Sequence, residues 1–161
     1  MTTTATAAAD APGRPDTARI LLVVVALYLG AFWSWSGIAK SLAPDAAYAF
    51  AAQVVGGGLP AKSIVVISVA LETALGLVLL VGAIARRTGI IVSLALLVAF
   101  LGLLVAAKVQ GGGTLACGCY AFFATDAATV DTELWINGGH AAILGAVLAV
   151  HAFLRRPSAP A

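Results

Sequence analysis

Residues 89–107 read GIIVSLALLVAFLGLLVAA, an apolar run in which no residue carries a charge. A helix that crosses a lipid bilayer needs about 20 predominantly apolar residues, and this run has that length and character. Three other stretches share its composition, at about residues 19–38, 62–85 and 134–154. The sequence therefore predicts an all-α membrane protein, built as a bundle of four transmembrane helices.

The composition of the whole chain supports this prediction. Of its 161 residues, 61% are hydrophobic and only 10% are charged, whereas a soluble domain carries about 25% charged residues. The net charge of +2 is small and scattered, which argues against nucleic acid as a partner and leaves membrane lipid as the main surroundings. We predict one membrane domain over residues 19–155, between a disordered cytoplasmic tail at 1–18 and a short cytoplasmic tail at 156–161.

Basic residues indicate how the helices are oriented. With four spans, the N-terminus, the link between the second and third spans, and the C-terminus lie on one side of the membrane. That side holds the arginines and the opposite side holds the lysines: Arg14, Arg19, Arg86, Arg87, Arg155 and Arg156 against Lys40, Lys62 and Lys108. Because basic residues of short loops stay in the cytoplasm, we expect both termini in the cytoplasm of a multi-pass plasma-membrane protein, with two long loops outside.

The two outer loops differ in character. The first contains an alanine-rich segment at residues 44–55, followed by Gly56-Gly57-Gly58-Leu59-Pro60. We expect a short interfacial helix there, ended by the glycines and followed by a new helix after the proline. The second loop, at about 110–133, begins with three glycines and continues to Cys117-Gly118-Cys119. It therefore carries both cysteines of the chain.

Cys117 and Cys119 are the first candidate catalytic residues. The predicted topology puts them outside the cytoplasm, where disulfides form and persist. A pair separated by one residue reaches disulfide geometry only in a tight turn, and Gly118 permits the necessary backbone angles. So short a loop adds little stability when it is closed, and its strain favours exchange with other thiols. Redox exchange is the favoured interpretation, with a passive bridge or two incidental cysteines as the alternative.

Glu72 is the third candidate catalytic residue, near the middle of the second predicted span. A carboxylate at that depth in the bilayer costs free energy, so such a residue is by default a candidate for a functional site. We expect it to be protonated or paired with a polar group of another helix, and to face the bundle because Ser68 and Gly76 share its helical face. Lys40, at the outer end of the first span, can pair with it only by reaching inward. Two interpretations of Glu72 remain open, namely a quinone-binding or proton-relay role and a purely structural hydrogen bond.

His140, Lys40 and Trp33 are the candidate residues for cofactor binding. His140 falls about two turns into the fourth span, within reach of the cysteine loop, although an interfacial histidine bonded to a carbonyl is the competing interpretation. Trp33, like Trp35 and Trp135, lies near the outer end of its span, where an aromatic belt also accounts for it. No metal is expected, because zinc takes four ligands and no histidine lies in the cysteine loop.

Small and polar residues predict how the spans pack, since small side chains let helices approach closely in lipid. Asn137 should face protein and form a hydrogen bond there. One face of each span carries small residues at helical spacing: Ala26, Gly30 and Ser34; Ser68 and Gly76; Ala95 and Ala99; Ala141, Gly145 and Ala149. We expect these faces to meet neighbouring helices, although such spacings also arise by chance in alanine-rich helices.

The order of these elements resembles a known family. The first span ends in Ser36-Gly37-Ile38-Ala39-Lys40, followed by Pro44 and Leu59-Pro60, and the second contains Leu71-Glu72-Thr73-Ala74-Leu75-Gly76. Cys117-Gly118-Cys119-Tyr120 follows the third span, and Asn137 begins the fourth. Over about residues 19–155 the chain resembles the MauE branch (methylamine utilisation protein E) of the DoxX-like small membrane proteins. The cysteine element is the most specific part, although Ala121 stands where the family usually has glycine.

The resemblance implies a four-helix membrane protein that acts in disulfide formation or maturation of exported proteins. Its namesake is similar in role to a maturation factor for the disulfide-rich small subunit of methylamine dehydrogenase, and the DoxX side implies quinone-linked sulfur oxidation. We therefore expect a thiol–disulfide oxidoreductase whose partner is an exported thiol protein or a thioredoxin-like protein, with a membrane quinone as cofactor. A non-catalytic anchor or accessory subunit of a partner enzyme complex is the alternative, and the pattern specifies no number of subunits.

Overall fold

The computed structural model describes residues 17–82, 84–111 and 130–154, and the regular structure within these ranges is helical. Five helices follow one another: α1 (Thr17–Leu42), α2 (Pro44–Val55), α3 (Leu59–Leu80), α4 (Arg86–Val109) and α5 (Val130–Leu154). All except α2 are long and apolar enough to cross a membrane. The prediction of an all-helical protein with four candidate spans is therefore confirmed.

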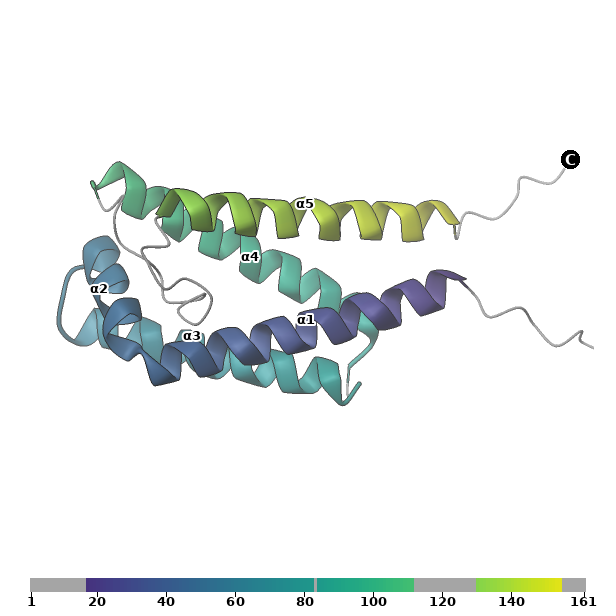
Figure 1. Ribbon diagram of the computed structural model, residues 1–161, viewed down its shortest axis with the longest axis horizontal. Helices are drawn as coiled ribbons and strands as arrows, with labels where there is room; N and C mark the ends of the chain where they lie inside the picture. Colours follow the sequence, from purple (N-terminus) through teal and green to yellow (C-terminus); the bar gives the residue numbers. More distant parts are fainter. Residues whose placement is uncertain (1–16, 83, 112–129, 155–161) are drawn as a thin grey trace, which may run out of the picture.

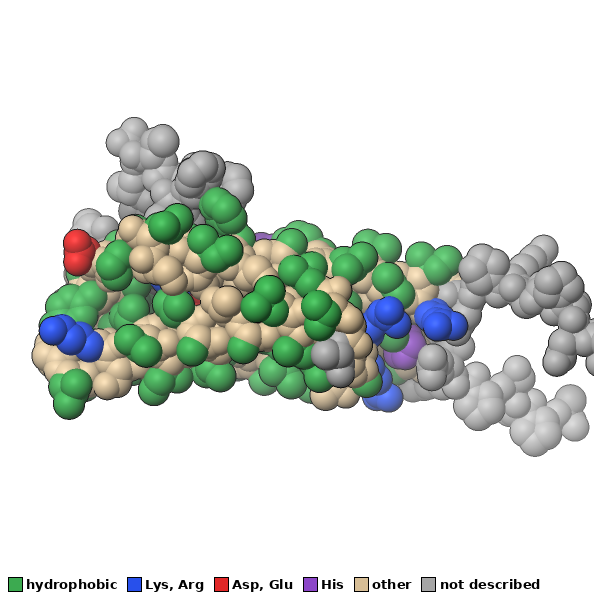
Figure 2. All heavy atoms as spheres, turned by 90° about the horizontal axis from the view of Figure 1, so that it is seen from below, with side chains coloured by type: hydrophobic (Ala, Val, Ile, Leu, Met, Phe, Trp, Pro, Cys, Tyr) green, Lys and Arg blue, Asp and Glu red, His purple; other side chains and the backbone are tan. Residues whose placement is uncertain are grey.

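The four long helices run side by side along the length of the molecule (Figure 1). α2 lies at the end where α1 finishes and α3 begins, and α4 finishes and α5 begins at this same end. The start of α1, the link between α3 and α4, and the end of α5 lie at the opposite end. Figure 2 shows hydrophobic side chains over the middle of the molecule and Lys and Arg side chains toward its ends. Which end faces the cytoplasm stays a prediction.

The tightest packing joins α1 to α3, because glycines bring the two backbones together. A Cβ atom at Gly76 would lie 2.4 Å from the backbone nitrogen of Ser34 and 2.8 Å from the carbonyl oxygen of Gly30. A Cβ atom at Gly37 would lie 2.3 Å from the hydroxyl oxygen of Thr73. The prediction that the small-residue faces of the first two spans meet a neighbouring helix is confirmed, and the structure shows that these two helices form one close pair.

The second pair is α4 and α5, which meets the first pair across an apolar core. Buried side chains from all four long helices form the main cluster: Leu22, Ala26, Leu29, Trp33, Leu79, Ile90, Leu97 and Leu144. A smaller cluster joins α2 to the ends of α4 and α5 that lie beside it: Phe50, Leu104, Ala107 and Val130. By contrast, α3 and α4 touch only lightly although they follow each other in the chain.

Several helix boundaries differ from those predicted. α3 begins and ends earlier than the predicted range 62–85, because a helix tolerates Pro60 in its first turn and Gly82, with φ of 68°, follows its end. α1 begins inside the predicted tail, at Thr17, and continues past the predicted end at residue 38. α4 exceeds its predicted range at both ends, and α5 begins before residue 134. Polar residues thus continue helices beyond their apolar centres.

α2 occupies the segment for which a short helix was expected, and its end is marked by Gly56 with φ of 82°. Gly58, with φ of 80°, precedes α3. These backbone angles favour glycine, so the chain turns sharply between the two helices. The position of α2 at a membrane interface stays a prediction.

The small-residue faces of the last two spans do not pack as expected. Ala95 and Ala99 on α4 are exposed, and so is Ala149 on α5. A Cβ atom at Gly145 would meet nothing within 4 Å. The prediction that these two faces meet neighbouring helices is therefore wrong, because in helices so rich in alanine the spacing arises without a partner.

Candidate functional site

Lys40 and Glu72 form a buried ion pair between α1 and α3. The ammonium nitrogen of Lys40 lies 2.7 Å from each carboxylate oxygen of Glu72. Lys40 is 3% exposed and Glu72 is 0% exposed. The prediction that Glu72 faces the interior of the bundle is confirmed, and its partner is the lysine that reaches inward from the end of α1. The pair is neutral overall, which lowers the cost of holding both charges away from water.

Two serines and a phenylalanine surround this pair. Lys40 donates to the hydroxyl oxygen of Ser36 at 3.0 Å, and the hydroxyl of Ser68 donates to Glu72 Oε1 at 2.6 Å. Each serine lies four residues from its charged neighbour, which puts the two on one helical face. The ammonium also lies 5.0 Å from the ring centroid of Phe100 on α4, within cation–π range. These five residues are called the Lys40–Glu72 centre below.

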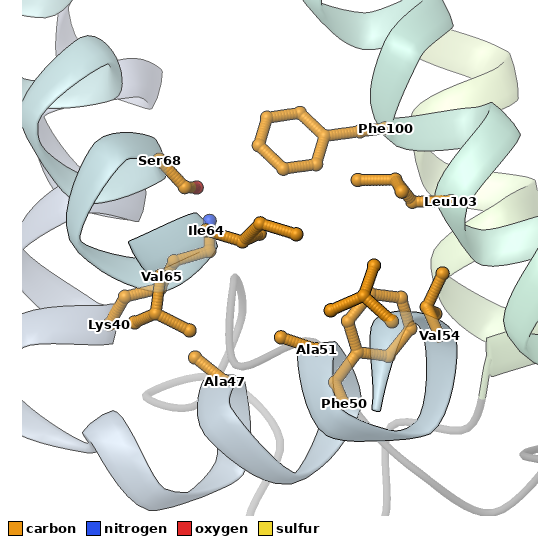
Figure 3. A pocket seen from close by; sticks show the side chains of 11 residues that line it. Lys40, Ala47, Phe50, Ala51, Val54, Ile64, Val65, Ser68, Phe100 and Leu103 are labelled. Carbon is orange, nitrogen blue, oxygen red and sulfur yellow. The ribbon is translucent and has the colours of Figure 1, made fainter. Parts of the chain in front are cut away.

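A small cavity borders the Lys40–Glu72 centre. Lys40, Ser68 and Phe100 line it together with apolar residues of α2, α3 and α4. Figure 3 shows Ser68 and Phe100 on opposite sides of the cavity, with Ala47 and Ala51 of α2 below them. The cavity volume is about 30 Å³, which leaves room for about two water molecules. α2 thus forms one wall of this cavity at the end of the bundle.

The chain on either side of residues 112–129 lies beside α2. The side-chain amide of Gln53 on α2 donates to the carbonyl oxygen of Gln110 at 2.9 Å, just after the end of α4. Val130, the first residue of α5, is buried in the cluster that α2 forms with α4. The segment therefore leaves and rejoins the described part of the bundle next to the helix that covers the cavity. The two predicted catalytic cysteines belong to this segment and lie outside the described residues: Cys117 and Cys119.

His140 lies in a different part of the bundle. Its Nδ1 atom is 2.8 Å from the carbonyl oxygen of Ile136. Because a carbonyl oxygen only accepts hydrogen bonds, Nδ1 carries the proton and donates it. Nε2 then accepts the hydrogen bond from the Tyr28 hydroxyl. The imidazole ring lies 5.0 Å from the ring of Phe32, centroid to centroid. Twelve residues of α1, about 18 Å of helix, separate Tyr28 from Lys40. The structure therefore does not bring His140 to the Lys40–Glu72 centre.

Trp33 packs inside the bundle and not in an interfacial belt. Its side chain is 2% exposed, and its indole N–H donates to the hydroxyl oxygen of Ser93 at 3.0 Å. Its ring lies 6.1 Å from the ring of Phe100, so it supports the ring that covers Lys40. The belt explanation for Trp33 is therefore wrong, because the rotation of α1 turns this residue inward. Trp135, at 83% exposed, points outward as a belt residue does.

Sequence reasoning gave no role to Phe100 or Ser93. Phe100 is the one aromatic residue and Ser93 the one hydroxyl residue of the third predicted span. The hydroxyl interrupts the apolar run and could have marked Ser93, whereas Phe100 is itself apolar and carries no such signal. Asn137 was predicted correctly. It is 4% exposed, and its side-chain amide donates to the carbonyl oxygen of Glu133 at 2.9 Å.

Comparison with known proteins agrees with this architecture. A family model described as methylamine utilisation protein MauE matches residues 18–151, a range that contains the Lys40–Glu72 centre and nearly all of the five helices. No curated protein and no solved structure matches the chain. The family model covers well over half of the sequence, and the described part of the structure has four candidate membrane spans. The chain therefore belongs to the MauE family of membrane proteins.

Proposed function

We propose that this protein is a membrane thiol–disulfide redox protein, which supports disulfide formation in an exported partner and passes the electrons to a membrane quinone. Cys117 and Cys119 are the exchanging pair, on the extracytoplasmic side of the plasma membrane. The observation that carries the proposal is the buried Lys40–Glu72 centre at the end of the bundle where the cysteine-bearing segment leaves α4 and enters α5. Membership of the MauE family supports it.

The proposed exchange moves two electrons in each turnover. A thiolate of the partner attacks the disulfide between Cys117 and Cys119, so that one S–S bond breaks and a mixed disulfide forms. The second thiolate of the partner then displaces the cysteine of this protein. The partner leaves with a new disulfide, and Cys117 and Cys119 remain as thiols. A quinone, when bound, supplies an acceptor for the two electrons and two protons that must leave these thiols to restore the disulfide.

The Lys40–Glu72 centre fits such an acceptor. A quinone oxygen requires a hydrogen-bond donor or a positive charge nearby. Lys40 and Ser68 line the cavity, and their N–H and O–H groups donate to Ser36 and Glu72, so one of these bonds would be exchanged for a bond to the quinone. Phe100 adds a flat aromatic surface beside them. Glu72 accepts hydrogen bonds from both Lys40 and Ser68, which holds these two side chains at the cavity. His140 is left out of this part of the proposal because of its distance along the bundle.

Trapping of a mixed disulfide tests the proposal. In Cys117→Ser or Cys119→Ser, the remaining thiolate attacks the disulfide of an oxidised partner, in the reverse of the proposed exchange, so that the partner's S–S bond breaks and a mixed disulfide forms. The second cysteine that would release the reduced partner is absent, so the adduct persists. We expect a partner-linked species on non-reducing gels, and a reductant should cleave its mixed disulfide. The double variant, Cys117→Ser with Cys119→Ser, is the matched control and should trap nothing.

The same variants separate the two kinds of function. Each single serine variant should abolish function of the pathway in cells while protein levels stay near normal, because both core clusters of the described helices are built from residues outside 112–129. Full pathway function in the double serine variant would refute the redox role. The protein would then act as a non-catalytic anchor or accessory subunit of a partner enzyme.

A further inference from the structure

A third charged residue is buried near the Lys40–Glu72 centre. Glu133 belongs to the first turn of α5 and is 0% exposed. Its charge acts on the ammonium of Lys40, while the hydrogen bonds of that ammonium go to Ser36 and Glu72. Two buried carboxyl groups, one from α3 and one from α5, therefore interact with one buried cation.

The packing at the start of α5 brings Glu133 to this place. Val130 belongs to the same apolar cluster as Phe50 of α2, and Leu134 packs against that cluster. Phe50 also lines the cavity beside Lys40. The first turn of α5 thus packs against a residue that forms the wall of the cavity, and Glu133 lies between its two apolar contacts.

The charges of the three buried groups do not balance if all are ionised, because one ammonium faces two carboxylates. Lys108 on α4 pairs with Asp131 while both are more than half exposed, Lys62 on α3 is exposed, and residues 112–129 contain no Lys, Arg or His. A hydrogen bond from a neutral group to Glu133 leaves this count unchanged. Since a buried net charge is costly, the centre gains by binding one proton.

The contacts of Glu72 decide which carboxyl group carries the proton. Lys40 lies 2.7 Å from both oxygens of Glu72, and Ser68 donates to one of them at 2.6 Å. These donors favour the ionised form of Glu72. The N-terminus of α5 favours an ionised Glu133, but this influence is smaller than the cost of a buried net charge.

We infer that Glu133 is a neutral carboxylic acid at neutral pH and the proton-carrying group of the Lys40–Glu72 centre. A protonated carboxyl group donates a hydrogen bond and can pass its proton to a base. Release of the proton leaves a second carboxylate beside Lys40, so the proton is taken up again unless the centre loses another negative charge. Glu133 is therefore suited to relay protons and not to act as their final acceptor.

In the proposed exchange, two protons must leave the thiols in each turnover, and Glu133 lies on the helix that follows the segment with Cys117 and Cys119. The relay of these protons by Glu133 rests on the proposed function. The protonation of Glu133 does not, because it follows from the charges of the centre.

Carbon NMR of the full-length protein in lipid nanodiscs tests the inference. Glu72 and Glu133 are the only glutamates of the chain, so glutamate that is isotopically labelled at its carboxyl carbon reports on these two groups. At neutral pH we expect one resonance at the position of a carboxylic acid and one at that of a carboxylate. Two carboxylate resonances would overturn the inference.

Variants assign the two resonances. Ser68→Ala should shift the carboxylate resonance, because Ser68 donates to Glu72, and should leave the acid resonance in place. Glu72→Gln should move the resonance of Glu133 to the carboxylate position, since Lys40 then balances its charge. Asp131→Asn, at an exposed acid in the same turn of α5, is the matched control and should move neither. A shift of the acid resonance in Ser68→Ala, or its persistence in Glu72→Gln, would contradict the inference.

The double variant Cys117→Ser with Cys119→Ser separates this inference from the redox proposal. It exchanges no thiols but should show the same acid and carboxylate resonances as the unmodified protein. Loss of the acid resonance in this variant would show that the proton does not depend on the charges of the centre, which overturns the inference. Failure to trap a mixed disulfide while the acid resonance is present would refute the redox function alone.

Discussion

At the scale of single residues, Lys40 and Glu72 depend on each other. The ammonium faces both oxygens of one carboxylate, one hydroxyl and one aromatic ring. Removal of one partner from a buried pair costs about 3–5 kcal/mol, whereas replacement of both by apolar groups costs far less. The two residues should therefore respond to mutation as one unit, and an exposed ion pair should not.

Lys40→Met should lower the free energy of unfolding by about 3–5 kcal/mol, because it leaves the carboxylate of Glu72 buried without its cation. Addition of Glu72→Leu to this variant should recover part of the loss. Unfolding by denaturant in mixed micelles measures both effects. Lys108→Met is the control, since Lys108 and Asp131 pair while 53% and 57% exposed, and should cost less than about 1 kcal/mol. Equal losses at the two pairs would contradict the expectation.

Tyr28→Phe should change the environment of His140 without changing its tautomer. Nδ1 keeps its donor role because it faces the carbonyl oxygen of Ile136, while Nε2 loses the hydroxyl that donates to it. We expect a loss of about 1 kcal/mol of stability and a shift of the Nε2 resonance in nitrogen NMR. A switch of the proton from Nδ1 to Nε2 would show that the assignment of donor and acceptor is wrong.

Individual residues were predictable from sequence only where chemistry allows few arrangements. A carboxylate within an apolar span must face protein, so the interior position of Glu72 followed from its neighbours. The inward position of Trp33 did not follow, because hydropathy reports the depth of a residue and not the rotation of its helix. Phe100 was hidden for a related reason: nothing in a continuous apolar run indicates which side chain meets a charge from another helix.

At the scale of elements, the close pair of α1 and α3 depends on glycine. The backbone of α1 lies where the Cβ atom of any other residue at position 76 would be, so Gly76 has no room for a side chain. Gly102, in contrast, lies on α4 with nothing within 4 Å of its Cβ position. Substitution of glycine by alanine can therefore be compared at a crowded position, Gly76, and at an open one, Gly102.

Gly76→Ala should destabilise the protein by about 1–3 kcal/mol, because the added methyl group forces the two backbones apart. Gly102→Ala should be neutral or stabilising by up to about 1 kcal/mol, since alanine is the better helix former. Thermal unfolding in detergent compares the two variants. A Gly76→Ala variant as stable as Gly102→Ala would show that the helices are not in close contact in the membrane protein.

Elements were more predictable than residues, but their ends were not. Four apolar runs gave four long helices, because length and hydrophobicity suffice for that inference. The ends escaped prediction, as at Leu59, which starts α3 before Pro60, and at Leu80, after which Gly82 turns the chain. The faces of α4 and α5 also escaped it, since alanine is common on packed and unpacked faces alike. The interfacial position of α2 stays a prediction.

At the scale of the whole molecule, the four long helices form two pairs, α1 with α3 and α4 with α5, and α2 packs at one end of them. The contacts between them include the bond from Trp33 to Ser93 and the approach of Phe100 to Lys40. The starts and ends of the four long helices lie at two opposite ends of the molecule (Figure 1). The orientation of the molecule in a membrane therefore reduces to one question, namely which end faces outward.

An impermeant thiol reagent should label Cys117 and Cys119 in intact cells after mild reduction. The expectation follows from the sequence, in which the order of the spans predicts six arginines on one side of the membrane and three lysines on the other. Mass spectrometry of the labelled peptide is the readout, with lysed cells as the reference for complete labelling. Labelling that requires lysis would reverse the predicted orientation.

The ion pair between Lys40 and Glu72 also has a consequence for the order of events during synthesis. A charged side chain released alone into the bilayer costs about 3 kcal/mol at the helix centre, and Glu72 lies near the middle of α3 whereas Lys40 lies at the end of α1. α3 therefore gains if it leaves the translocon beside α1 and pairs with Lys40 there. In a ribosome-bound chain that includes both helices, Lys40→Met should keep α3 longer in contact with the translocon, which cross-linking measures.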